Sequence, residues 1–82
     1  MRKVKVILNT IDNIKEFVMN MNKYDLIADV STDNRKQLVD AKSIMGVIAI
    51  SSNKPITVTL LDNDKDKVEI FDTIMQKFNI VE

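Results

Sequence analysis

Hydrophobic and polar positions follow regular periods from the first residues of the chain. Residues 3–8 alternate between lysine and aliphatic side chains, which predicts a half-buried strand. Apolar residues then recur at helical spacing over residues 11–21, and Thr10 or Asp12 can serve as the N-cap of that helix. The chain therefore begins with a strand followed by an amphipathic helix.

The next segment has the pattern of a hairpin. Residues 26–30 alternate again, and residues 32–34 carry the side chains that favour turns. A short strand that carries Leu38 and Val39 should complete the hairpin.

The second half of the chain predicts a short helix, a strand and a longer helix. Ser43 precedes the apolar stretch 44–50 and is suited to cap it. Pro55 stands at the start of a β-branched segment, 56–61, which is a position where a strand tolerates proline. Apolar residues then recur at helical spacing over 68–78.

Acidic residues precede this last helix. Asp66 and Glu69 have the spacing of a capping box. Asp62, Asp64 and Asp66 alternate like the start of a calcium loop, but the glycine and glutamate that such a loop needs further on are missing. Helix capping is the better interpretation.

The predicted element order is β-α-β-β-α-β-α. The strands follow one another too closely for a doubly wound parallel sheet. We predict an α+β fold with a single domain over residues 1–82, in which three helices cover one face of a four-stranded antiparallel sheet. The other face stays solvated, and the side chains that point that way are Lys3, Lys5, Thr57 and Thr59.

The amino-acid composition mainly excludes classes of binding site and of catalytic chemistry. Twelve basic and twelve acidic residues cancel, and no basic run or aromatic platform suits a nucleic acid. The chain has no cysteine and no histidine, which excludes disulfides, zinc–thiolate sites, thiol nucleophiles and a hydrolase triad. Gly46 is the one glycine, so no glycine-rich phosphate loop exists. We expect a protein without cofactor or metal that is not an enzyme.

The chain carries no sign of a membrane segment. Its apolar runs are far shorter than the ~20 residues of a membrane helix, and the N-terminal residues lack a signal-peptide pattern. We therefore expect a cytoplasmic protein with no membrane partner.

The middle of the chain resembles a known family. The segment 40–47, which contains Lys42-Ser43-Ile44-Met45-Gly46, is similar to the regulatory-serine segment of HPr, the histidine-containing phosphocarrier of the bacterial sugar phosphotransferase system. The segment Lys23-Tyr24-Asp25 and the order of elements over residues 3–78 are also similar. The resemblance implies the HPr-like open-faced β-sandwich, which agrees with the fold predicted from periodicity.

The chemistry of that family is missing. Its members carry a histidine at the start of the first helix, and Thr10 falls nearest to that position in the stretch 8–14. Asp12 falls nearest to the family's arginine and would repel a transferring phosphoryl group. Because a threonine phosphoester is too stable for relay, this chain cannot act as a phosphocarrier.

The resemblance also implies a regulatory site. In similar proteins the serine that matches Ser43 is phosphorylated by an ATP-dependent kinase, and the modified form binds a transcriptional repressor. A phosphate there meets free backbone N–H groups, and Lys42 adds attraction. Ser43 can also be no more than a helix cap, which is compatible with modification.

The same short helix offers a surface for partners. We expect Ile44, Met45 and Ile48 to lie near its surface with Lys42, whereas Val47 and Ile50 belong to the core. Ile11 and Ile14 can border that surface. Ordinary core packing is the alternative for these residues.

Three hypotheses about function remain open. The first is a non-catalytic HPr-like regulator or adaptor, switched at Ser43 and bound by a serine kinase, a transcriptional regulator or phosphotransferase components. The second is an accessory subunit or competitor in a sugar-uptake complex. The third is a diverged domain without any phosphotransferase role. We expect a monomer or a weak homodimer.

Overall fold

The computed structural model describes residues 2–32, 36–51 and 54–81. The elements within these ranges are β1 (Arg2–Ile7), α1 (Ile11–Lys23), β2 (Ala28–Thr32), β3 (Leu38–Asp40), α2 (Ile44–Ile50), β4 (Ile56–Leu60), α3 (Lys65–Met75) and β5 (Asn79–Ile80). The predicted order is confirmed as far as α3, and β5 is added after it.

The strands form one antiparallel sheet in the order β3-β2-β4-β1-β5. Val58 of β4 stands between Val4 of β1 and Val30 of β2, so three β-branched residues cross the centre of the sheet in register. The prediction of four strands misses β5, which pairs its two residues with Val6 and Ile7.

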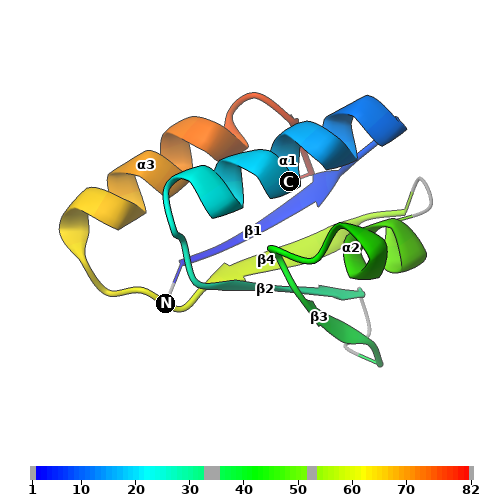
Figure 1. Cartoon of the computed structure of the whole chain (residues 1–82), viewed down its shortest axis with the longest axis horizontal. Coiled ribbons are helices and arrows are strands. Elements are labelled where there is room, and N and C mark those ends of the chain that lie inside the picture. Colours follow the sequence, from blue (N-terminus) through cyan, green and yellow to red (C-terminus); the bar gives the residue numbers. More distant parts are fainter. Residues whose placement is uncertain (1, 33–35, 52–53, 82) are drawn as a thin grey trace.

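All three helices lie on one face of this sheet, as predicted. Figure 1 shows α1 and α3 on the same side of the strands, with α2 beside the start of α1. The core fills the space between the layers, and Phe17 of α1 meets Phe78 edge to face with ring centroids 5.9 Å apart. The opposite face of the sheet is partly exposed and carries Lys3 and Thr57.

The helix ends follow from capping side chains. Thr10 accepts a hydrogen bond from the Asn13 amide at 3.0 Å and caps α1, as predicted. The predicted capping box of Asp66 and Glu69 is wrong, because Asp64 accepts from the Asp66 amide at 2.9 Å and α3 begins one residue after Asp64. Asp66 therefore lies inside the first turn.

The ends of α3 and of the hairpin differ in detail from the sequence pattern. Helix α3 ends at Met75. Phe78 belongs to the turn that follows, and its side chain is buried in the core. β2 and β3 pair as the predicted hairpin, while residues 33–34 of its predicted turn lie outside the described residues.

None of the helices in the described ranges combines the length and the apolar character needed to cross a membrane.

Candidate functional site

Ser43 is the N-cap of α2, as predicted. Its backbone is extended, and its Oγ accepts a hydrogen bond from the Gly46 amide at 3.3 Å. The Ser43 amide donates to the Asp40 carbonyl at 3.0 Å, which turns the chain directly from β3 into α2. The side chain is exposed, so a kinase could reach the hydroxyl.

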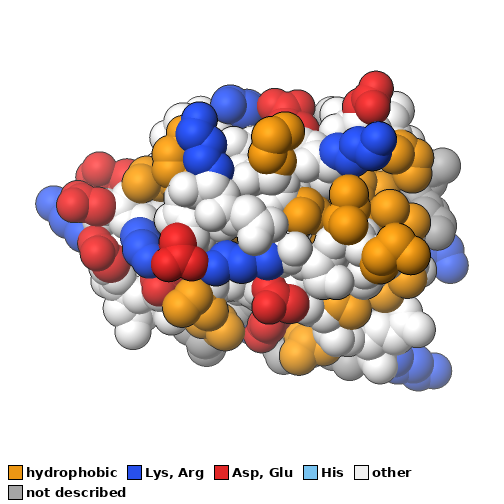
Figure 2. Space-filling model, in the orientation of Figure 1, with side chains coloured by type: hydrophobic (Ala, Val, Ile, Leu, Met, Phe, Trp, Pro, Cys, Tyr) orange, Lys and Arg blue, Asp and Glu red, His pale blue; other side chains and the backbone are white. Residues whose placement is uncertain are grey.

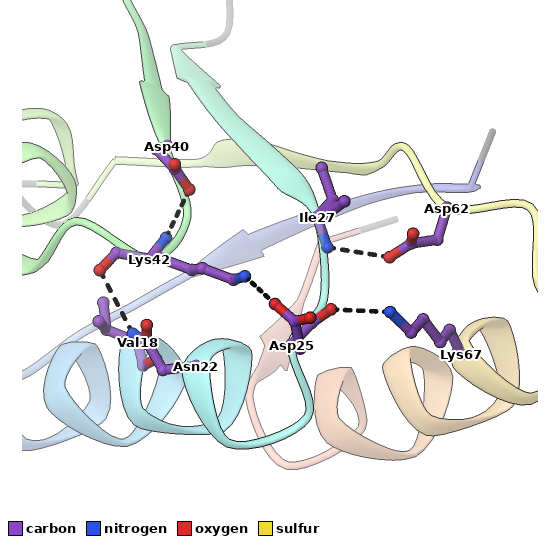
Figure 3. A network of polar contacts seen from close by, with 8 residues as sticks. All are labelled: Val18, Asn22, Asp25, Ile27, Asp40, Lys42, Asp62 and Lys67. Atoms are coloured by element: carbon purple, nitrogen blue, oxygen red, sulfur yellow. Dashed lines mark hydrogen bonds and ion pairs between the residues drawn. The ribbon is translucent and has the colours of Figure 1, made fainter.

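Lys42 holds this segment against α1. Its amide donates to a carboxylate oxygen of Asp40 at 2.9 Å, and its carbonyl accepts from the Asn22 side chain at 3.3 Å. Its ammonium group forms an ion pair with the Asp25 carboxylate (Figure 3). The structure therefore places Lys42, predicted as a partner-binding residue, in contacts within the chain.

Asp25 joins three elements at the point where α1 ends. Its φ of 50° makes it the left-handed residue after the helix, and the amides of Asp25 and Leu26 bond to the Asn22 and Met21 carbonyls at 3.2 and 3.0 Å. Its carbonyl accepts from the Lys67 ammonium group of α3 at 3.0 Å (Figure 3). Asp25 thus connects the end of α1 to the start of both α2 and α3.

The charges around Asp25 change its titration. The hydrogen bond from Lys42 holds the pKa of the Asp25 carboxyl below its ordinary value, and the positive charges of Lys42 and Lys67 act in the same direction. The carboxylate is therefore the favoured form down to a lower pH than for an isolated aspartate.

An apolar surface extends from α2 to the start of α1, and we name it the α2 patch: Ile11, Ile44, Met45 and Ile48. Met45 is 75% exposed and Ile11 is 51% exposed. Ile44 and Ile48 are half-buried, whereas Val47 and Ile50 are buried as predicted. Figure 2 shows hydrophobic side chains gathered over this end of the molecule. Ile14, which was also expected at the border, is buried instead.

A hollow lies beside the α2 patch. It has a volume of about 220 Å³ and is lined by residues from the loop before α1, the first turn of α1 and the end of α2, which include Thr10, Ile11, Ile48 and Ser51. The hydroxyl of Ser51 is buried and has no hydrogen-bond partner among the described residues. The assignment of Thr10 to the histidine position of resembling proteins stays a prediction.

Gly46 allows α2 to approach β3 closely. A Cβ atom on this residue would lie 3.1 Å from the Cβ of Val39 and 3.2 Å from the Ser43 Oγ, which is tighter than ordinary packing. The short distance between β3 and α2, and not the backbone conformation of Gly46, therefore favours glycine at this position.

The acidic residues before α3 have structural roles. Asp62 accepts from the Ile27 amide at 2.9 Å, and Asp64 caps α3. No group of three metal-ligating side chains occurs in the ranges that the structure describes.

Sequence reasoning missed two residues that link the helices around Ser43. Asn22 and Lys67 were not singled out, because their contacts with Lys42 and Asp25 join residues 20 and 42 positions apart. The one signal in the sequence is the segment Lys23-Tyr24-Asp25, which is similar to the HPr family but gives no indication of these contacts.

Comparisons with known proteins concern the fold. The sequence matches no protein-family model and no curated protein. Among solved structures, HPr-C-His from Thermoanaerobacter tengcongensis superposes with a TM-score of 0.68 at 20% identity and covers 94% of this chain and 93% of its own. The phosphocarrier protein HPr from Bacillus anthracis str. Ames has a TM-score of 0.68 at 22% identity, with coverage of 95% and 96%. The chain has the fold of the HPr phosphocarrier proteins, with one added edge strand.

Proposed function

We propose that this protein is a non-catalytic, HPr-like regulator that binds a protein partner through the α2 patch and is switched by phosphorylation of Ser43. The observation that carries the proposal is the display of Met45 two residues after an exposed Ser43, on a helix fixed at both ends. An exposed methionine is well suited to an adaptable binding surface. The likeness to phosphocarriers supports a role beside the phosphotransferase system.

A covalent relay is excluded from the proposal by composition. The chain contains no histidine, so no imidazole can accept and release a phosphoryl group. The polar side chains of Thr10 and of the hollow beside it are the hydroxyls of Thr10 and Ser51 and the amide of Asn9, and none of these can relay a phosphoryl group. The protein therefore acts through contacts.

Phosphorylation would change the charge of the surface. A phosphate on Ser43 adds roughly −1.5 to −2 charges next to the α2 patch. Asp40 lies close by and repels it, while Lys42 is engaged with Asp25. A partner that binds the modified form should therefore supply its own cationic group, and one that docks on the apolar patch alone should be released.

The first test is modification. The protein and a Ser43→Ala variant are incubated with ATP and extract from the source cells, and mass spectrometry locates any phosphate. We expect phosphate on Ser43 of the wild type and none at this position in the variant. An unmodified Ser43 under several growth conditions would refute the switch.

The second test is binding by the α2 patch. Partners crosslinked to the wild type are compared with those of Met45→Asp and of a matched control, Met19→Asp, because Met19 is also a helical methionine, 62% exposed, but lies outside the patch. We expect Met45→Asp to lose a partner that Met19→Asp retains. Identical binding by all three proteins would remove the α2 patch from the proposal.

A further inference from the structure

A second surface hollow lies along α3. Its volume is about 390 Å³, and its lining residues include Tyr24 at the end of α1 together with Asp66, Glu69, Ile70, Ile74 and Lys77. We name it the α3 groove. No residue of the α2 patch lines it, so the two surfaces can be occupied at the same time.

The charges of the α3 groove are separated along its length. Asp66 and Glu69 lie in the first half of α3, and Lys77 follows its end; the helical residues from Asp66 to Met75 alone span about 14 Å at 1.5 Å per residue. Within the part of the chain that the structure describes, these three side chains form no ion pair or hydrogen bond. By contrast, Lys67 and Asp72 on the same helix bond to Asp25 and Arg2.

This arrangement is complementary to itself. A two-fold axis is the usual symmetry of a homodimer, and two identical helices run antiparallel when that axis is perpendicular to them. With the axis between residues 71 and 72, Asp66 of each copy faces Lys77 of the other, and Ile70 faces Thr73. We propose that the α3 groove binds a second copy of this chain through two antiparallel α3 helices, with the reciprocal Asp66–Lys77 pairs at the rim.

The middle of the groove suits such a contact. Tyr24 is 38% exposed and Ile70 is half-buried, while Ile74 forms the floor. The Thr73 hydroxyl donates to the Glu69 carbonyl at 3.0 Å, so its burial would leave no hydrogen-bond donor unpaired. The apolar surface is small, which makes the dimer weak and lets the charged rim decide its affinity.

The experiment measures self-association by sedimentation equilibrium and by 15N–1H NMR over a concentration series up to the millimolar range. We expect concentration-dependent chemical shifts at Tyr24 and along α3, and an association that weakens as salt rises. Lys77→Glu should weaken the dimer by about tenfold, because it replaces two attractive pairs by two repulsive ones. The control Lys15→Glu makes the same charge change on the exposed side of α1 and should have no effect.

The decisive variant exchanges the charges. Asp66→Lys combined with Lys77→Asp should restore affinity to within about threefold of the wild type, since each pair is rebuilt with opposite sign. Three outcomes would overturn the proposal: a monomer at millimolar concentration, a dimer that Lys77→Glu does not weaken, or a double variant no tighter than Lys77→Glu. Concentration-dependent shifts at the α2 patch with none at α3 would also overturn it.

Discussion

The contact between Gly46 and Val39 can be tested by adding one methyl group. Gly46→Ala gains helix propensity of at most about 1 kcal/mol. The added Cβ would stand 3.1 Å from the Val39 Cβ and 3.2 Å from the Ser43 Oγ, and overpacking of this kind costs roughly 1–3 kcal/mol. The clash outweighs the gain because the Val39 Cβ moves only with the backbone of β3. We expect a net loss of about 1 kcal/mol of unfolding free energy.

Urea denaturation measures this loss, and a thermal scan should show a midpoint about 4–8 °C lower. Ala49→Gly is the matched control, because Ala49 is exposed on the same helix and its change costs propensity alone, about 1 kcal/mol. A double-mutant cycle with Val39→Ala should show coupling of about 0.5 kcal/mol or more. If Gly46→Ala is more stable than the wild type, or does not couple to Val39, the close approach of α2 to β3 is refuted.

Two further predictions concern single polar groups. Ser51→Ala removes a buried hydroxyl that has no hydrogen-bond partner among the described residues. We therefore expect urea denaturation to give an unfolding free energy about 1 kcal/mol higher than that of the wild type. A clearly lower unfolding free energy would show that the hydroxyl is hydrogen-bonded. Asp25→Asn keeps a residue that tolerates positive φ but removes the carboxylate whose pKa is lowered by Lys42. The stabilisation from that carboxylate is present above its ordinary pKa of 3.8 and is lost as the pH falls through the lowered value, so the difference in stability between wild type and variant should begin to shrink below about pH 4 and vanish below the lowered pKa. A difference that stays constant between pH 6 and pH 2.5 would contradict this.

Periodicity predicted the elements that bury one face and failed where burial is absent. β4 alternates between buried and partly exposed residues, and α1 buries Phe17 and Met21 at helical spacing, so both have strong sequence signals. Asn79 and Ile80 of β5 are both exposed, and their pairing with β1 comes only from backbone hydrogen bonds. No alternation could have indicated that strand.

In the candidate site, too, the sequence predicted the local features and missed those that depend on tertiary contacts. The Ser43 cap and the burial of Val47 and Ile50 depend on local order along the chain, and sequence alone predicted them. The ion pair between Lys42 and Asp25 depends on how the end of α1 meets the start of α2, which is tertiary geometry. The sequence predicts Lys42 as a partner-binding residue, and only the structure shows that its ammonium group also pairs with Asp25.

The anchoring of α2 determines how a phosphate on Ser43 could act. A helix of seven residues is not stable alone, so α2 depends on its buried residues, its contact with β3 and the link from Lys42 to α1. None of these contacts uses the Ser43 side chain beyond the cap at Gly46. Modification should therefore change the charge of the α2 patch and leave its shape intact.

This consequence separates an electrostatic switch from a conformational one. In 15N–1H NMR spectra, phosphorylated Ser43 should shift the amides of residues 42–48 and leave the strands and α3 unchanged. The effect of the phosphate on partner affinity should shrink as the salt concentration rises from about 0.05 to about 0.5 M. Over this range the Debye length falls from above about 10 Å to well below it, so the charges are screened more strongly. Shifts that spread through the sheet, or an effect on affinity that salt does not alter, would mean that the phosphate rearranges α2, and the contacts at Gly46 and Lys42 would then be too weak to hold it.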